Sequence, residues 1–306
     1  MRILIIGYGS IGMRHAEISR ECGHNISILS RRKNIYDKCY QELEVALDNS
    51  KPELIIIANE TSIHHSTIEE LNRLGYSNKI LVEKPLSQHF SQEQNKNHNN
   101  IFVGYNLRFN PIISSLKTSL QSETVCTASL YVGQYLPSWR NNQDYSKSYS
   151  ASKKHGGGVL RDLSHELDLS CWLFGEWTAL TSLGGKFSTL DIDSEDNYSI
   201  LLKTEKCKAV QIHLNYLNQE PKRQIIINTL NNTYEANLIK KTLTINGKVK
   251  SFDSEYNSTY KSQLNDVLKV VPSETCSYAE GNSIVNMIEK IEYANNNNYW
   301  VENQLL

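Results

Sequence analysis

The 306-residue sequence lacks the patterns that mark several classes of protein. No apolar run approaches the length of a membrane span, and the apolar start of the chain is too short for the core of a signal peptide. We therefore expect a cytoplasmic protein with no membrane partner. The six cysteines are scattered, with no CxxC pair and no cysteine–histidine cluster at zinc spacing. This arrangement favours reduced thiols and no metal site.

The sequence also lacks an excess of either charge, since its formal net charge is -1. Domains that bind nucleic acid are usually basic, so we expect no nucleic-acid partner. No internal repeat or long linker interrupts the chain. Its length is sufficient for two domains, each with its own hydrophobic core.

Glycines are few, 15 in total, but they gather in two places. The first follows the apolar run at residues 2–6, which is typical of a strand, and precedes a helical pattern. A GxGxxG motif in this context combines a tight turn, close approach of the backbone to a pyrophosphate, and close packing of helix on strand. It predicts a dinucleotide site formed by Gly7, Tyr8, Gly9, Ser10, Ile11 and Gly12.

The second expected strand, residues 25–29, ends in Ser30, Arg31 and Arg32, with no acid before Asp37. An acid at the end of this strand usually binds the ribose 2′-hydroxyl of NAD. A serine hydroxyl and guanidinium groups instead suit the 2′-phosphate of NADP. The sequence therefore predicts NADP as cofactor, with NAD as the alternative.

Apolar runs at residues 54–58, 79–82 and 101–105 alternate with helical patterns, which predicts a parallel sheet with right-handed crossovers that the last run closes. Cofactors bind at the carboxyl ends of such strands. We expect Asn59, Thr61 and His64, in the loop after residues 54–58, to contact the cofactor. The run at 79–82 is followed by Glu83-Lys84-Pro85. The proline indicates a specific turn, and a cis peptide bond before the proline is one way to form it.

The second glycine cluster, residues 156–158, precedes a helical pattern that runs to residue 174. Spacings of three and four predict one helix with an apolar stripe, formed by Leu160, Leu163, Leu167, Cys171 and Phe174. At 100° per residue, Arg161, His165 and Asp168 share another face, with Asp162 just beyond His165. This polar face is either a ligand site beside the glycine turn or a solvated helix surface.

The remaining sequence is mostly typical of strands. Residues 210–216 alternate between apolar and polar side chains, which indicates a strand with one buried and one exposed face. Asn246-Gly247, between residues 242–245 and 248–252, predicts a type I′ hairpin. Helical patterns follow at residues 262–270 and 278–294.

The order of three motifs resembles that of the Gfo/Idh/MocA family of oxidoreductases. The motifs are GxGxxG at residues 7–12, Glu83-Lys84-Pro85, and the three glycines followed by His165-Glu166-Leu167-Asp168. The resemblance covers nearly the whole chain. It implies a dinucleotide-binding Rossmann domain at residues 1–105. An α+β domain at residues 106–306, with a mostly antiparallel open sheet, would bind substrate and form a homo-oligomer, either a dimer or a tetramer.

The resemblance also implies residue roles. Lys84 would polarise the reacting oxygen, His165 would take the proton of the substrate hydroxyl, and Glu83 would belong to the cofactor site. Family members commonly carry an aspartate four residues before this histidine, where this chain has Arg161, and the acid is one place later at Asp162. Either Asp162 still reaches the imidazole or Arg161 anchors an anionic substrate, and we favour the anchor on electrostatic grounds.

Three further residues are candidates for substrate binding, besides Asp168, which either orients a substrate hydroxyl or belongs to a structural network. Arg108 leads out of the first domain and is expected to face the cleft. Trp139 and Arg140 lie in a loop rich in aromatic residues and arginine, which suits sugar rings and anionic groups. Packing of that loop on its own aromatic side chains is the alternative. The loop looks like that of a branch found in bacterial surface-sugar pathways.

Taken with the resemblance, these patterns predict an NAD(P)-dependent oxidoreductase. It would transfer a hydride between nicotinamide and a hydroxyl or keto carbon of a sugar, sugar acid or nucleotide-linked sugar, in bacterial surface-glycan synthesis. Two alternatives are a glycosidase-type enzyme that uses its cofactor transiently and a non-catalytic NADP-binding regulator.

Overall fold

The chain forms two compact units in this computed structural model, which describes residues 1–32, 36–92, 98–139 and 144–303. The first unit comprises Met1–Phe109 and Tyr256–Val285, and the second comprises Asn110–Glu255 and Asn286–Leu306. The sequence predicted a single division of the chain, between residues 105 and 106. The return of residues 256–285 to the first unit depends on packing between segments far apart in the chain, which a linear pattern does not contain.

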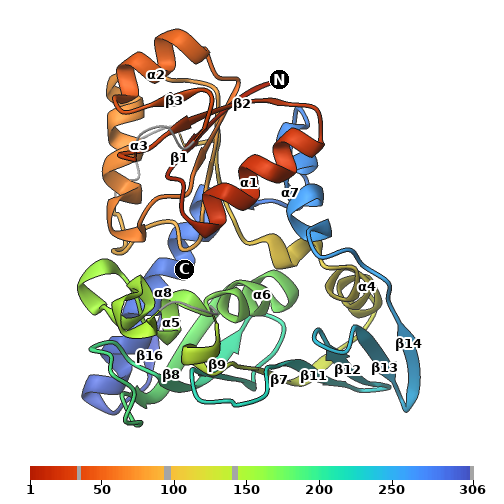
Figure 1. Ribbon diagram of the computed structural model, residues 1–306. Coiled ribbons are helices and arrows are strands. Elements are labelled where there is room, and N and C mark those ends of the chain that lie inside the picture. Colours follow the sequence, from red (N-terminus) through yellow and green to blue (C-terminus); the bar gives the residue numbers. More distant parts are fainter. Residues whose placement is uncertain (33–35, 93–97, 140–143, 304–306) are drawn as a thin grey trace. The chain divides into compact units, whose positions relative to one another are not determined.

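The first unit, drawn with its first strands labelled in Figure 1, is built on a seven-stranded sheet. The strand order is β15-β6-β5-β4-β1-β2-β3. Its strands are β1 (Arg2–Ile6), β2 (Asn25–Leu29), β3 (Cys39–Tyr40), β4 (Leu54–Ile57), β5 (Lys79–Val82), β6 (Ile101–Val103) and β15 (Cys276–Ser277). Strands β1 to β6 pair in parallel. The predicted Rossmann-type parallel sheet is therefore confirmed.

The edge of this sheet differs from the prediction. The run at residues 101–105 was expected to close the sheet, but β6 ends at Val103, and β15 pairs with it in the antiparallel direction. Two residues from a segment about 170 positions later thus cover the β6 edge. The prediction was wrong because so short a strand carries no periodic signal of its own.

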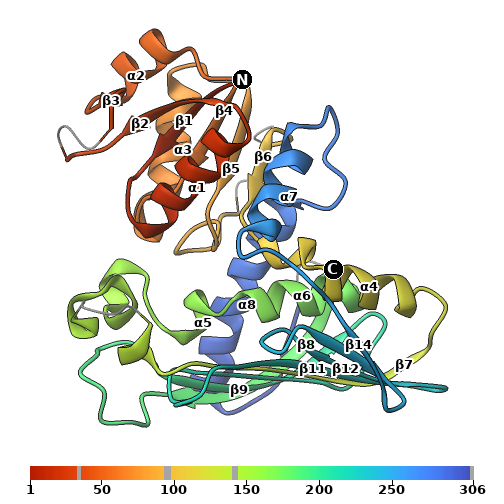
Figure 2. The same cartoon turned by 45° about the vertical axis from the view of Figure 1, so that its right-hand side comes forward.

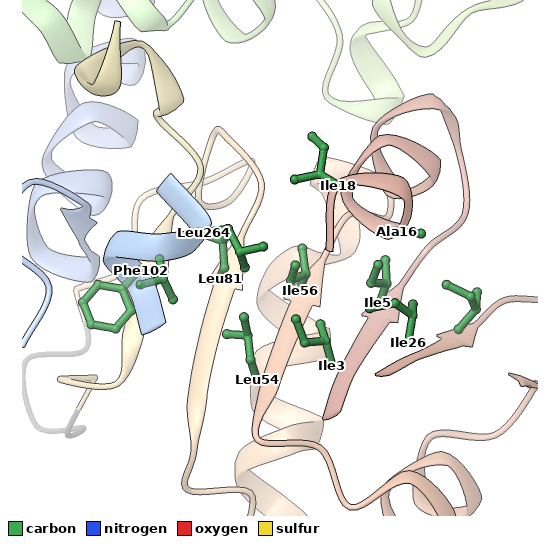
Figure 3. Packing of buried hydrophobic residues seen from close by; sticks show 12 residues of the cluster. Ile3, Ile5, Ala16, Ile18, Ile26, Leu54, Ile56, Leu81, Phe102 and Leu264 are labelled. Atoms are coloured by element: carbon green, nitrogen blue, oxygen red, sulfur yellow. The ribbon is translucent and has the colours of Figure 1, made fainter. Parts of the chain in front are cut away.

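Helices cover both faces of the first sheet (Figure 1). They are α1 (Ser10–Glu21), α2 (Leu43–Ser50), α3 (His64–Arg73) and α7 (Ser258–Leu268). Alternate strand residues such as Ile3, Ile5 and Ile56 form one buried cluster with Ile18 of α1 and Leu264 of α7 (Figure 3). Burial on both faces explains why these strands are continuous apolar runs.

The second unit contains a nine-stranded sheet with the order β14-β13-β12-β11-β7-β10-β9-β8-β16. Its strands are β7 (Val125–Gly133), β8 (Trp177–Gly185), β9 (Asn197–Thr204), β10 (Val210–Asn215), β11 (Lys222–Thr229), β12 (Thr233–Asn237), β13 (Thr242–Ile245), β14 (Lys248–Ser251) and β16 (Val301–Glu302). Among these described strands, β10 and β7 pair in parallel and the other neighbouring pairs are antiparallel. The mostly antiparallel sheet is confirmed.

The predicted hairpin is also present. β13 and β14 pair antiparallel around Asn246 and Gly247, whose φ angles are 47° and 79°. Positive φ at both central residues is the signature of a type I′ turn.

Helices of the second unit lie on the same side of its sheet (Figure 2). They are α4 (Pro111–Leu120), α5 (Val159–Asp162), α6 (His165–Phe174) and the later part of α8 (Tyr278–Asn297). The side chain of Asn110 caps α4 by accepting from the Ile112 amide, and Pro111 opens its first turn. Within the described part of the chain, no helix is both long and apolar enough to cross a bilayer.

The single helix predicted after the glycine cluster is wrong, because α5 and α6 are separated at Leu163 and Ser164. The Ser164 hydroxyl donates to the Arg161 carbonyl at 3.0 Å, which satisfies a backbone acceptor at the end of α5. Serine often competes with helical hydrogen bonding in this way. The projection of residues 161–168 at 100° per residue therefore does not hold across the break.

Candidate functional site

The glycine turn between β1 and α1 is packed too closely for side chains at two of its positions. A Cβ on Gly7 would lie 2.6 Å from the Ala58 carbonyl oxygen, and Gly7 has a φ of 95°. A Cβ on Gly12 would lie 2.1 Å from the Gly7 carbonyl oxygen. The turn is thereby held against the residues that follow β4, its neighbour in the sheet.

Gly9 differs, because a Cβ there would meet nothing within 4 Å. Gly9 and Ser10 are exposed at the N-terminus of α1, and none of the side chains that the structure describes caps this end of the helix. The first amides of a helix have no carbonyl partner within the helix, and together with the helix dipole they favour an anion. An open glycine beside such amides fits a pyrophosphate group.

The end of β2 lies beside the same turn. The Arg32 guanidinium donates to the Tyr8 carbonyl, and the Arg32 amide donates to the Ser30 hydroxyl at 3.2 Å. Arg31 and Arg32 are exposed. The structure therefore brings Arg32 to the glycine turn, and a guanidinium group is chemically suited to a phosphate.

His64 joins the loops that follow β4 and β5. Its Nδ1 lies 3.0 Å from the Pro85 carbonyl and its Nε2 lies 3.2 Å from the Asn59 carbonyl. Complete burial lowers the pKa of His64, so the ring is neutral at physiological pH. Thr61 is buried in a short 3-10 turn at Thr61–Ile63, and the Asn59 amide group donates to the Thr67 hydroxyl at 3.0 Å.

Glu83, Lys84 and Pro85 directly follow β5, and the Lys84–Pro85 peptide bond is cis. Lys84 is half-buried. Glu83 is buried, and its Oε1 lies 2.7 Å from Nε2 of His15. Strands β5, β4, β1 and β2 are parallel neighbours, so their carboxyl ends lie side by side. These carboxyl ends carry Lys84, Asn59, the glycine turn and Ser30–Arg32, respectively.

In the second unit, His165 is the first residue of α6 and is half-buried. Asp162, at the end of α5, accepts a hydrogen bond from the Tyr216 hydroxyl at 2.6 Å. Tyr216 is fully buried, and burial together with the Asp162 carboxylate raises the pKa of Tyr216. The tyrosine therefore stays protonated and donates. Its role was not predicted, because nothing local links residues 162 and 216.

Arg161 pairs with Glu292 of α8, with 2.7 Å between Nη1 and Oε1, and it is only 6% exposed. Burial would lower the pKa of Arg161, but it stays raised because Glu292, Glu195 and Glu289 place negative charge around the guanidinium. A substrate anion would have to compete with these carboxylates. The surroundings favour a structural ion pair over the expected anchor.

The other charged side chains of α6 also lie inside the unit. Asp168 is 1% exposed, so its carboxylate does not lie on a solvated helix face. Glu166 is 1% exposed and pairs with Arg223 of β11, with 2.8 Å between Oε1 and Nε. The carboxylates of Glu166 and Asp168 are therefore enclosed by protein, and a buried carboxylate requires hydrogen-bonded or charged partners.

Glu195 was also missed by the sequence analysis. Its Oε1 accepts from the Leu160 amide at 3.4 Å, and a Cβ on Gly158 would lie 2.2 Å from the same oxygen. Burial raises the pKa of Glu195 to about 7. This carboxyl group therefore changes charge near neutral pH beside the start of α5.

The remaining candidates have internal partners. Trp139 donates from Nε1 to the Gln134 carbonyl at 3.1 Å and packs edge-on against Tyr216, which links its loop to Asp162. Arg108 is 4% exposed and pairs with Glu280, with 2.9 Å between Nη1 and Oε1, within the first unit. Arg140 lies outside the described residues.

Comparison with protein families gives two matches. A profile described as an oxidoreductase family with an NAD-binding Rossmann fold, GFO_IDH_MocA, matches residues 1–104. A profile of the GFO/IDH/MocA C-terminal domain matches residues 116–237. Comparison with curated proteins gives no match.

Solved structures share the fold along almost the whole chain. Levoglucosan dehydrogenase in complex with NADH and levoglucosan has 14% identity and a TM-score of 0.84, over 99% of both chains. GenD2 from gentamicin A biosynthesis in complex with NAD has 18% identity and a TM-score of 0.80, over 99% of this chain and 96% of GenD2. UDP-N-acetylglucosamine 3-dehydrogenase GnnA from Acidithiobacillus ferrooxidans has 16% identity and a TM-score of 0.75, over 96% and 97%.

Proposed function

This chain belongs to the Gfo/Idh/MocA family of NAD(P)-dependent oxidoreductases, and on that premise we propose that its substrate is a sugar, a sugar acid or a nucleotide-linked sugar. The enzyme would transfer a hydride between nicotinamide and a hydroxyl or keto carbon of that substrate. The single observation that carries the proposal concerns the carboxyl ends of the parallel strands in the first sheet. The glycine turn follows β1 and Lys84 follows β5, and both strands pair with β4 between them.

For the cofactor, we assign the pyrophosphate to the turn at Gly7, Gly9 and Gly12, with Tyr8, Ser10 and Ile11 beside it. The open space at Gly9 supports this assignment. Ser30, Arg31 and Arg32 would bind the 2′-phosphate of NADP, while Asn59, Thr61, His64 and Glu83 would shape the nicotinamide side. When bound, the nicotinamide supplies or accepts the hydride.

For proton transfer, we assign His165 as the general base that takes the hydroxyl proton when the substrate is oxidised, and as the acid in the reverse direction. Lys84 would polarise the reacting oxygen and stabilise its developing negative charge. Asp162, held by Tyr216, would support α5 and α6 beneath His165. In this proposal Arg161 and Arg108 stabilise the fold through Glu292 and Glu280.

The sugar class is supported by the compounds named for the neighbours in fold, levoglucosan and UDP-N-acetylglucosamine. Trp139 offers an aromatic face, which suits the apolar face of a sugar ring, and Arg140 and Asp168 remain candidates for its polar groups. A place in bacterial surface-glycan synthesis agrees with this substrate class.

The proposal is tested by binding and turnover. Purified protein is titrated with NADPH and NADH by fluorescence and then assayed against sugars, sugar acids and nucleotide sugars for a net change in reduced-cofactor absorbance. Net consumption supports the dehydrogenase. Product formation without net cofactor change would favour the transient-redox glycosidase, and tight cofactor binding with no turnover of any sugar would favour the regulator.

The role of His165 is tested by His165→Ala. We expect kcat to fall by about 10²–10⁴-fold, because general acid–base catalysis typically contributes that much, with cofactor affinity unchanged. His155→Ala is the matched control, since His155 is exposed in the same unit. Full turnover by His165→Ala would contradict the assignment.

A further inference from the structure

A buried histidine–carboxylate pair immediately precedes Lys84. His15 of α1 and Glu83 are joined by the 2.7 Å contact between Nε2 and Oε1, and their side chains are 5% and 11% exposed. A carboxylate so deeply buried is stable only with hydrogen-bonded or charged partners. His15 stands three residues after Gly12, so the helix that begins at the glycine turn also supplies the partner of Glu83.

The Glu83 carboxylate contacts the Lys84 backbone directly. Its Oε2 accepts from the Lys84 amide at 3.2 Å. On another side, a Cβ on Gly104 would lie 3.1 Å from the same oxygen, so β6 and its end leave the carboxylate little room to move. The Pro85 carbonyl is held in turn by His64 at 3.0 Å. Lys84 is thus placed from both sides, by Glu83 before it and by His64 after it.

The charges around Glu83 make His15 the decisive partner. Burial raises the pKa of Glu83, but the hydrogen bond from His15 and the charges of His15 and Lys84 outweigh burial and lower it. On α7, the ring of Tyr260 packs edge-on against His15, and burial with the Glu83 charge raises the pKa of Tyr260 to about 12. On α3, burial lowers the pKa of His64. Tyr260 and His64 are therefore neutral near pH 7, and Glu83 is the anion of this cluster.

We propose that His15 is a positioning residue, which binds the Glu83 carboxylate and through it fixes both the backbone and the electrostatic surroundings of Lys84. The inference rests on the proposed role of Lys84. It adds a residue that the motif itself does not contain, because His15 acts from another element, 68 positions away in the sequence.

The first test uses three variants. His15→Leu removes the hydrogen-bond donor, and we expect kcat to fall about 10²-fold, because small displacements of a reacting group have effects of this size. His15→Gln keeps an N–H near the position of Nε2 and should recover kcat to within about tenfold of the wild type. Ser19→Ala is the control, because Ser19 is buried on the same helix and its hydroxyl has no hydrogen-bond partner among the described residues.

The second test needs no turnover. The pH at which Lys84 becomes reactive is measured by competitive acetylation and mass spectrometry. Without His15, the hydrogen bond and charge that mainly offset burial are lost, so the pKa of Glu83 rises and its attraction for the Lys84 ammonium weakens. We expect Lys84 to react at a pH lower by roughly one unit or more in His15→Leu. Glu83→Gln should show the same shift if His15→Leu does not fold, and His15→Gln should behave as the wild type.

The outcomes separate this inference from the proposed function. A wild-type protein that turns over no sugar contradicts the proposed function. In that case the pH dependence of Lys84 acetylation alone tests the role of His15. If Lys84 reacts at the same pH in the wild type, His15→Leu and Glu83→Gln, the inference is wrong. It is also wrong if His15→Leu keeps the wild-type kcat in an active enzyme.

Discussion

At the scale of single residues, the charged groups near α5 and α6 are governed by burial. Arg161, Glu166 and Asp168 have exposures of 6%, 1% and 1%. An ionised group in such a place requires an opposite charge or several hydrogen bonds. Arg161 and Glu166, which pair with Glu292 and Arg223, therefore hold α5 and α6 in place, whereas His165 is half-buried.

Glu195 yields a prediction about stability and pH. Burial raises its pKa from about 4.5 to about 7, so the folded protein holds a proton that the unfolded chain releases between these values. Stability should therefore fall as the pH rises from 4.5 to 7. Glu195→Gln removes this loss, and we expect it to be more stable than the wild type above pH 7 by roughly 1–3 kcal/mol.

Urea unfolding measured on both sides of this interval tests the prediction. Below pH 4.5 the free energies of unfolding of the two proteins should differ little, because Glu195 is then protonated in both the folded and the unfolded chain. Glu220→Gln serves as the control, since Glu220 is exposed in the same unit. A constant difference at every pH would show that the carboxyl group of Glu195 does not titrate in this interval.

Arg32 yields a prediction about cofactor choice. Its guanidinium already contacts the glycine turn through the Tyr8 carbonyl. Arg32→Ala should weaken NADPH binding about 10–100-fold, because a hydrogen bond to a charged group contributes about 1.5–3 kcal/mol. NADH binding should change little. Fluorescence titration measures both, with the exposed Arg20 of α1 changed to Ala as the control. Equal losses for the two cofactors would remove Arg32 from the 2′-phosphate site.

At the scale of elements, the glycine turn shows how one motif combines two requirements. Gly12 must be a glycine because its helix packs against the Gly7 carbonyl, whereas Gly9 has open space at its Cβ position. The first requirement concerns folding and the second concerns a ligand. The sequence motif is the same for both, and only the surrounding atoms distinguish them.

These two glycines provide a matched pair of variants. Gly9→Ala should keep the thermal stability of the wild type but weaken NADH and NADPH binding, because the added methyl group occupies the space into which a pyrophosphate would fit. Gly12→Ala should lower the melting temperature as well, since its Cβ would lie 2.1 Å from the Gly7 carbonyl oxygen. Thermal unfolding and cofactor titration are measured on both. Unchanged cofactor affinity in Gly9→Ala would place the pyrophosphate elsewhere.

The break between α5 and α6 shows where periodicity fails. The apolar residues Leu160, Leu163 and Leu167 continue their spacing across Leu163 and Ser164, so the sequence predicts one helix. The Ser164 hydroxyl bonds the Arg161 carbonyl instead, and α6 restarts at His165. Spacing records which side chains are buried, and it does not record whether the backbone between them stays helical.

At the scale of the whole molecule, one face of the nine-stranded sheet carries several exposed apolar side chains among polar ones. The strand register places Leu201, Ile226 and Val249 on the same face, and they are 51%, 41% and 66% exposed. Leu183 is 65% exposed and pairs with Ser199, two residues from Leu201 on β9, which puts it on this face as well. These side chains make this face a candidate contact surface.

We predict that copies of this chain associate through this face. The double variant Leu201→Glu with Ile226→Glu should weaken association more than roughly tenfold, because it places charges in an apolar contact. Light scattering over a range of concentrations measures the mass. Val271→Glu is the control, since Val271 is 77% exposed in the first unit. An unchanged oligomer mass in the double variant would exclude this face.

The sequence by itself determined the features that depend on neighbours a few residues apart. β1, β2 and β5 begin and end at the predicted residues, because each is a short apolar run bounded by turn residues. The Asn246-Gly247 hairpin and the glycine turn after β1 are local in the same sense. The motifs also sufficed to identify the family, because they depend on residue type and order.

Only the tertiary structure decided the partners of the buried charges and the composition of each unit. Arg161 and Glu292 are 131 positions apart, and His15 and Glu83 are 68 apart. A buried charge must be neutralised by whichever group the fold brings within hydrogen-bond distance, and no local pattern encodes that group. The edge strand β15 could not be predicted for the same reason, because its partner β6 lies far from it in the sequence.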